Sequence, residues 1–235
     1  MSDISAGASE PSRRGVDAPG WLSGGRDESR WFAFGAIAVA AAVQLLLPDR
    51  LSLGPAWLLP CVEGAIAVGL LIAVPNRRRQ DSPLIRQAGL LLVAVMSIAN
   101  GFSAALLIRG LLGGRLTGGA GELLANGTGV YVTNIIAFAL WYWELDRGGP
   151  LVRAVGTYVH PDFLFPQMSA PNLARRDWQP TFLDYLYVSF TNATAFSPTD
   201  TMPLTRWAKM LMLVQSGIAL LTVALVIARA VNIFK

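Results

Sequence analysis

Five long apolar blocks, separated by charged segments, constrain the fold of this chain more than any other feature. The blocks lie at residues 31–48, 51–75, 87–108, 123–143 and 210–228, and Glu63 is the one charged residue inside them. Each block approaches or exceeds the ~20 residues that a helix needs to cross a ~30 Å hydrocarbon core. The sequence therefore predicts an all-α, polytopic membrane helix bundle with five spans plus a short sixth helix that either spans or re-enters.

Composition and charge support this class. Of the 235 residues, 53% are hydrophobic and 14% are charged, whereas soluble domains average about 25% charged residues. The net charge of +4 fits the excess of Arg and Lys in the cytoplasmic loops of membrane proteins. We therefore expect the chain to lie in the lipid bilayer and to form homo-oligomers. We expect it not to bind nucleic acid.

The single cysteine, Cys61, lies inside an apolar block. One cysteine cannot form an internal disulfide and provides no metal or redox motif. We expect it to be a small core residue, and we expect no cofactor or metal.

The chain divides into four segments. Residues 1–30 are poor in bulky aliphatic side chains and predict a disordered cytoplasmic tail. Residues 31–146 predict a four-span helical region, in which eight glycines between Gly110 and Gly129 predict a flexible external loop. Residues 147–180 form a Pro-rich cytoplasmic loop whose prolines preclude a long helix. Residues 181–235 predict a pore-like helical hairpin.

Arginines predict the orientation. They cluster before the first block, between the second and third blocks, and after the fourth block, whereas the intervening segments have fewer. Because cytoplasmic loops are rich in Arg and Lys, this alternation predicts a cytoplasmic N-terminus.

The hairpin leaves two topologies open. If residues 181–197 form a crossing helix, ~17 residues reach ~25 Å, the chain has six spans, and its C-terminus is cytoplasmic. If they re-enter, the chain has five spans and an external C-terminus. The sequence favours six, since that topology returns Arg229 and Lys235 to the cytoplasm.

Glu63 is the most conspicuous polar residue in the blocks. It lies roughly 12 Å deep at ~1.5 Å per residue, and a carboxylate at that depth is costly enough to suggest function. Arg109, Asn100 and Asn134 are its expected partners. Two interpretations stay open: a polar clasp between helices, or an ion or proton site.

The hairpin carries the other candidate residues of an ion or polar path. Its hydroxyl and amide side chains need partners in the hydrocarbon core, so we expect this helix to be the innermost of the bundle. Asp184, with Glu144 and Asp146, forms an acidic group at the expected cytoplasmic face. The candidate path residues are Glu63, Asn100, Asn134, Asp184, Thr191, Asn192, Thr194, Ser197, Thr199 and Asp200.

Three local expectations accompany this reading. Trp141, Tyr142 and Trp143 predict an interfacial aromatic belt. The apolar segment from Phe163 to Phe165 is expected to pack against helix ends. Asp200 or Thr201 is expected to cap the last helix, with Pro203 in its first turn.

The stretch from Tyr185 to Met210 resembles the pore module of potassium channels, in which a pore helix ends in T-V-G-Y-G-D before a Pro-containing turn and the inner helix. The filter positions here read Ala-Phe-Ser-Pro-Thr-Asp from Ala195 to Asp200. Ser197 and Thr199 replace both glycines, and Pro198 fixes its own φ. The standard potassium filter therefore cannot form.

A second resemblance covers the C-terminal two fifths. The segments Pro161–Gln167, Thr191–Thr205 and Arg229–Asn232 are similar to those of a family of uncharacterised bacterial multi-spanning membrane proteins. This resemblance implies a location in the bacterial inner membrane and no mechanism.

Three functions remain open from the sequence. The chain is a channel-like or transport protein, a non-transporting membrane subunit or scaffold, or an intramembrane enzyme. The last is disfavoured because neither H-E-x-x-H nor G-x-S-x-G occurs, so we expect no enzyme.

Overall fold

Helices form almost all the regular structure of the computed structural model, which describes residues 20–23, 30–73, 83–113, 119–155, 160–194 and 200–233. The long helices are α2 (Trp31–Leu46), α3 (Leu58–Ala73), α4 (Pro83–Leu112), α5 (Ala120–Leu145) and α9 (Arg206–Ile233). The short elements are α1 (Gly20–Ser23), η1 (Asp49–Leu51), η3 (Asp146–Gly148), α6 (Pro150–Val155), β1 (Phe163–Leu164), α7 (Pro166–Ser169), α8 (Phe182–Thr194) and β2 (Met202–Pro203). The all-α prediction is confirmed, since the two strands have two residues each.

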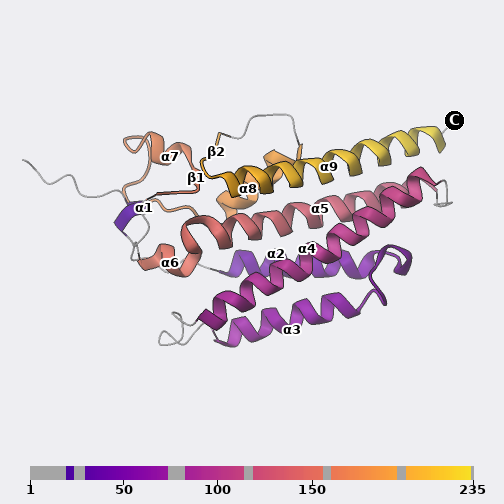
Figure 1. The fold of residues 1–235 in the computed structure, drawn as a ribbon, viewed down its shortest axis with the longest axis horizontal. Coiled ribbons are helices and arrows are strands. Elements are labelled where there is room, and N and C mark those ends of the chain that lie inside the picture. Colours follow the sequence, from indigo (N-terminus) through magenta and orange to yellow (C-terminus); the bar gives the residue numbers. More distant parts are fainter. Residues whose placement is uncertain are drawn as a thin grey trace, which may run out of the picture.

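The long helices run side by side, and α5 lies at the centre (Figure 1). It packs against α2, α4, α8 and α9. The most apolar stretch of α5 is 67% buried, compared with 44% for α4 and 28% for α9. The most enclosed helix is therefore α5, and not the hairpin helix that the sequence suggested.

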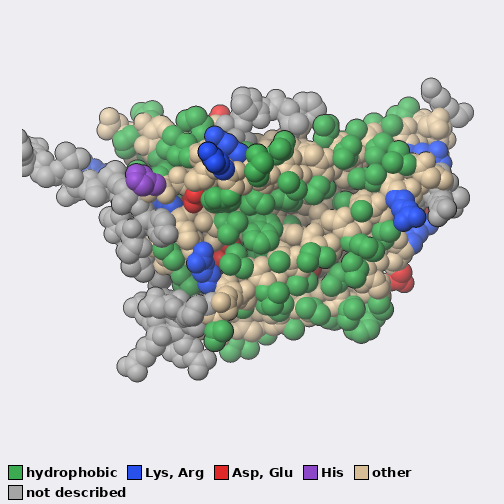
Figure 2. All heavy atoms as spheres, in the orientation of Figure 1, with side chains coloured by type: hydrophobic (Ala, Val, Ile, Leu, Met, Phe, Trp, Pro, Cys, Tyr) green, Lys and Arg blue, Asp and Glu red, His purple; other side chains and the backbone are tan. Residues whose placement is uncertain are grey.

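Three helices, α4, α5 and α9, are long and apolar enough to cross a membrane by length and composition. Helices α2 and α3 are apolar but have 16 residues each, which reach only ~24 Å. The prediction of five spans is therefore not supported. The surface is compatible with a membrane protein, because hydrophobic side chains cover the middle of the bundle and charged ones gather toward its ends (Figure 2).

The glycine-rich segment is largely helical. Helix α5 begins at Ala120 and includes Gly127 and Gly129, so the predicted flexible loop is wrong from that residue on. A Cβ added to Gly127 would lie 2.7 Å from Val226 Cγ2, and one added to Gly129 would lie 2.9 Å from Leu47 Cδ1. These glycines let α9 and the end of α2 approach the α5 backbone, as small residues do in membrane bundles.

Helix α8 does not cross the bundle. Phe182, at its start, packs on Trp143 near the end of α5. After α8 the chain reaches β2, which pairs antiparallel with β1 through Phe163↔Pro203 and Leu164↔Met202. Both sides of the hairpin therefore lie at one end of the bundle, here called the hairpin end (Figure 1). The six-span topology is wrong for this reason, and α9 ends at the other end, here called the opposite end.

The Pro-rich loop covers the hairpin end with short elements only, as its prolines predict. Phe163 and Phe165 are buried there, and both rings make edge contacts with Tyr185. The prediction that this segment packs against helix ends is confirmed. Part of the predicted tail is ordered against the same loop: Gly20 N donates to Arg176 O at 3.0 Å. The rest of the tail, residues 1–19 and 24–29, lies outside the described residues.

Candidate functional site

A cluster of polar side chains joins α5, α8 and α9 within the bundle, and we call it the hairpin polar cluster. It consists of Tyr142, Ser189, Asn192, Gln215 and Ser216. The Tyr142 hydroxyl donates to Gln215 Oε1 at 2.6 Å, and Gln215 Nε2 donates to Ser189 Oγ at 2.7 Å. Asn192 Nδ2 donates to Gln215 Oε1 at 2.8 Å, and Ser216 Oγ donates to Asn192 Oδ1 at 3.1 Å. One glutamine thus connects all three helices.

The cluster lies deep in the bundle. Ser189 Oγ donates to the Ile135 carbonyl at 2.6 Å, and Ile135 precedes Asp146 at the end of α5 by 11 residues, or ~16 Å. Ala193 packs against Ile135 and Ala219, with Tyr131 beside them. Helix α8 therefore ends near the middle of α5, and its last carbonyls lie at about half the depth of the bundle.

The threonines of α8 bond to their own helix. Thr191 Oγ1 donates to the Tyr187 carbonyl at 2.9 Å, and Thr194 Oγ1 donates to the Thr191 carbonyl at 2.9 Å. Such bonds satisfy a hydroxyl without an external partner. The outer face of α8 carries Leu183, Tyr187 and Phe190, which are about half exposed.

The remaining predicted residues of the hairpin have separate roles. Asp184 Oδ2 accepts from Thr181 N at 2.7 Å and from its hydroxyl at 2.9 Å, so it caps the start of α8. Asp200 is exposed at the hairpin end, while Ser197 and Thr199 lie outside the described residues. The predicted cap of the last helix is wrong, because α9 begins at Arg206, after Thr205, and β2 occupies Met202–Pro203.

Glu63 belongs to a different site. Its carboxylate is fully buried in the second turn of α3 and accepts from Gln44 Nε2 on α2, at 3.1 and 3.2 Å. The expected partners, Arg109, Asn100 and Asn134, were therefore wrong, because Gln44 was not among them. Cys61, two residues earlier, is exposed and is not the core residue that we expected.

A small cavity of about 20 Å³ approaches the Glu63 site from the opposite end. Gln44, Ser52 and Ser103 provide polar atoms in its wall. Asn100 and Asn134 are buried elsewhere in the bundle, and neither the Asn100 Oδ1 nor either polar atom of the Asn134 amide has a hydrogen-bond partner among the described residues. Of the ten predicted path residues, Ser197 and Thr199 lie outside the described part of the chain, and the other eight are distributed over several separate places.

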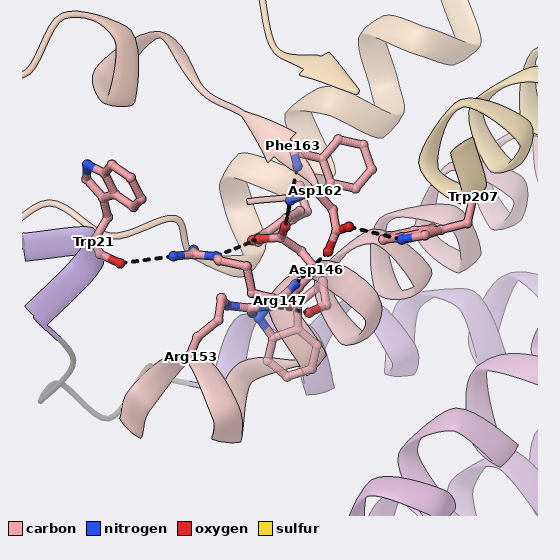
Figure 3. A network of polar contacts seen from close by, with 9 residues as sticks. Trp21, Asp146, Arg147, Arg153, Asp162, Phe163 and Trp207 are labelled. Carbon is pink, nitrogen blue, oxygen red and sulfur yellow. Dashed lines mark hydrogen bonds and ion pairs between the residues drawn. The ribbon is translucent and has the colours of Figure 1, made fainter. Parts of the chain in front are cut away.

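A buried ionic network lies at the hairpin end and joins the end of α5 to the starts of α8 and α9 (Figure 3). This network was not predicted from the sequence. Asp146 is fully buried, and its Oδ2 accepts from the Tyr185 hydroxyl at 2.5 Å and from Arg147 Nε at 3.2 Å. Burial raises the pKa of the Tyr185 phenol well above its usual value, so the hydroxyl keeps the proton that it donates. Asp146 is therefore a structural anchor and not part of an exposed acidic ring.

The same network holds the second side of the hairpin. Asp162 Oδ2 accepts from Arg147 N at 2.9 Å, and Asp162 Oδ1 accepts from Trp207 Nε1 at 3.0 Å. Arg153 Nη1 donates to the carbonyls of Trp143 and Asp146 at 2.7 and 2.8 Å. The start of α8 and the start of α9 are thus fixed to the end of α5 by buried charges.

The one sequence signal for this network was Asp146-Arg147-Gly-Gly-Pro directly after an apolar helix. Arg147 has a φ of 50°, an uncommon value for a residue with a side chain.

The predicted interfacial aromatic belt at the end of α5 is wrong. Tyr142 and Trp143 are buried inside the protein, and Trp141 Nε1 donates to Ser97 Oγ at 2.7 Å.

Comparisons of the chain with protein-family models, curated proteins and solved structures found no match. Among the described residues no group of three or more His, Cys, Asp or Glu side chains could hold a metal ion. The arrangement itself offers a short helix that ends inside the bundle and a polar cluster beside that end.

Proposed function

We propose that this chain is a channel-like membrane protein in which cations pass along the hairpin formed by α8 and the start of α9. The observation that carries the proposal is the geometry of α8. The helix enters from the hairpin end, stops near Ile135 at mid-depth, and is followed by β2 at the same end. Non-helical backbone at membrane depth is tolerated where it is buried in protein or lines a water-filled cavity.

The proposed selectivity for cations follows from the end of α8 that lies at depth. The C-terminus of a helix carries a partial negative charge of about half an elementary charge. The last turn of α8 contains no basic residue that would neutralise it. Half-helix C-termini and free carbonyls coordinate cations in transporters, so the end of α8 favours a cation over an anion.

The resemblance to the potassium-channel pore module supports the same proposal. In the described residues, the short helix, the proline and the long inner helix of that module correspond to α8, Pro203 in β2, and α9. Because the residues at the filter positions exclude a standard potassium filter, we propose a cation path without potassium selectivity of that kind.

We further propose that the hairpin end faces the cytoplasm of a bacterial cell and that the protein lies in the inner membrane. The described cations are unequally distributed, which supports this orientation under the positive-inside rule. The hairpin end carries eight: Arg30, Arg86, Arg147, Arg153, Arg175, Arg176, Arg206 and Lys209; the opposite end carries three: Arg50, Arg109 and Arg229.

Flux measurements on the full chain in liposomes test the proposal. We expect the wild-type protein to pass K⁺ or Na⁺ and to exclude Cl⁻. Thr194→Val keeps the side-chain shape but removes the hydroxyl in the last turn of α8, and we expect it to change cation flux severalfold. A matched control, Thr222→Val, changes a buried threonine of α9 and should leave the flux unaltered.

Absence of flux for any common ion, with a preparation that is folded and correctly inserted, would contradict the proposal. Equal effects of Thr194→Val and Thr222→Val would also count against it. In that case the change would reflect general packing and not a path beside α8.

The second candidate is a non-transporting membrane subunit or scaffold. It is favoured by the hydrogen bonds of the hairpin polar cluster, since Gln215, Ser189 and Asn192 bind one another and backbone carbonyls. Polar groups that are satisfied in this way hold helices together without needing water. The flux experiment separates the two candidates directly.

A further inference from the structure

A groove at the hairpin end is the strongest unassigned site. It is formed by the starts of α2 and α4, the end of α3, the end of α5 and the turn before α6, and its volume is about 50 Å³. A buried water needs roughly 10–15 Å³ of such volume. The groove therefore holds a group of a few heavy atoms, such as a phosphate with its neighbouring atoms.

The rim of the groove is charged. Arg30, before α2, and Arg86, on α4, contribute two guanidinium groups, and Glu144, in the last turn of α5, contributes a carboxylate. Gly89 allows this carboxylate to sit against α4, since a Cβ at that position would lie 3.1 Å from Glu144 Oε1.

The floor of the groove is apolar. Ile37, Leu70 and Leu140 contribute to it from α2, α3 and α5. Ile72 on α3 and Leu84 on α4, two residues and one residue along the chain from the lining residues Leu70 and Ile85, are 73% and 72% exposed and provide apolar surface on the same two helices. A ligand that fits has an anionic head and a hydrocarbon portion.

We propose that this groove binds the headgroup of an anionic phospholipid, with its phosphodiester between Arg30 and Arg86 and its acyl chains along the apolar surface beside Ile72 and Leu84. Arginine is suited to this task because its planar guanidinium binds phosphate oxygens in pairs. Basic pockets between helices on the cytoplasmic side are typical sites for such headgroups. Glu144 disfavours free phosphate, which carries more negative charge than a phosphodiester.

The proposal is tested by native mass spectrometry of the full-length protein after delipidation in mild detergent. Phosphatidylglycerol, phosphatidylethanolamine and inorganic phosphate are the probes. We expect phosphatidylglycerol to bind most tightly, and Arg86→Gln to weaken it about fivefold, given ~1 kcal/mol per basic residue near an anionic lipid. Arg175→Gln is the matched control, because Arg175 is 86% exposed at the same end and lies outside the groove.

A second variant keeps every charge and fills the floor. Leu70→Trp should reduce phosphatidylglycerol binding while leaving the thermal unfolding of the lipid-free protein close to wild type. Unchanged lipid binding in the Arg30→Gln/Arg86→Gln double variant would overturn the proposal. So would equal binding of phosphatidylethanolamine, or displacement of the lipid by millimolar phosphate, which would indicate a site for a free anion.

Discussion

At the scale of single residues, small and polar side chains determine how the helices of this bundle meet. Gln215 illustrates the polar contribution: it contacts Tyr142 on α5 and Ser189 and Asn192 on α8. Hydrogen bonds between helices in a membrane contribute ~0.6 kcal/mol on average. Several such bonds through one residue fix the position of α8 relative to both of its neighbours.

Glycines determine how closely the helices approach one another, and Gly127 is the clearest example. In Gly127→Ala the new Cβ would meet Val226 Cγ2 at 2.7 Å and Cγ1 at 2.9 Å. Valine cannot rotate both methyl groups away, so α5 and α9 must separate slightly. We expect a loss of ~1–3 kcal/mol of unfolding free energy, measured by titration from mild detergent into mixed micelles with a denaturing detergent.

The control is Gly121→Ala on the same helix, where no atom lies within 4 Å of the added Cβ. Alanine is the better helix former by ~1 kcal/mol, so this variant should be neutral or more stable. Val226→Ala combined with Gly127→Ala should recover part of the loss. Simple additivity of the two substitutions would contradict direct contact between them.

At the scale of elements, the hairpin distinguishes this molecule from a simple up-and-down bundle. Helix α8 has 13 residues and reaches ~20 Å, too short for a bilayer. Tyr185 at its start and Trp207 at the start of α9 are held by Asp146 and Asp162 of one network. The short helix is therefore anchored at one end, and its other end lies at depth.

Cysteine labelling from the two sides of a membrane checks this topology in a Cys61→Ser background. Asp200 and Leu173 are both exposed at the hairpin end, and Leu53 is 40% exposed at the opposite end. We expect Asp200→Cys and Leu173→Cys to react with an impermeant reagent from one side, and Leu53→Cys from the other. Labelling of Asp200→Cys and Leu173→Cys from different sides would show that the segment between them crosses the membrane.

The sequence predicted the helical class and the position of most long helices, because apolar periodicity and charge depletion are local properties. It could not predict that α5 would begin at Ala120, since glycine-rich sequence is typical of loops unless another helix packs against it. The partner of Glu63 also depended on tertiary packing. Arg109 seemed suitable by depth along the helices, but the rotation of α2 brings Gln44 to the carboxylate.

The crossing of α8 was mispredicted for a related reason. Its length alone left both topologies open, and the count of terminal charges favoured six spans. The decisive features were the two-residue strand pair, the hydrogen bond of Tyr185 on α8 to Asp146, and that of Trp207 on α9 to Asp162. Pairing between residues forty positions apart has no signature in local sequence.

At the scale of the whole molecule, we expect the proposed cation path to lie between two copies of the chain. Helix α8 lines neither the cavity of about 20 Å³ nor the groove of about 50 Å³ described above. The outer face of α8 remains about half exposed. A second copy against this face would shield the end of α8 from lipid and place the path between subunits.

Oxidative crosslinking tests this arrangement in the Cys61→Ser background. Phe190 is 51% exposed on the outer face of α8, and Val68 is 56% exposed on α3, on the far side of α5 in the bundle (Figure 1). We expect Phe190→Cys to give covalent dimers in native membranes on mild oxidation, because symmetric interfaces place equivalent residues near one another. Val68→Cys, which is equally accessible, should remain monomeric. Dimers from both positions would indicate random collision, and dimers from neither would place any cation path within a single chain.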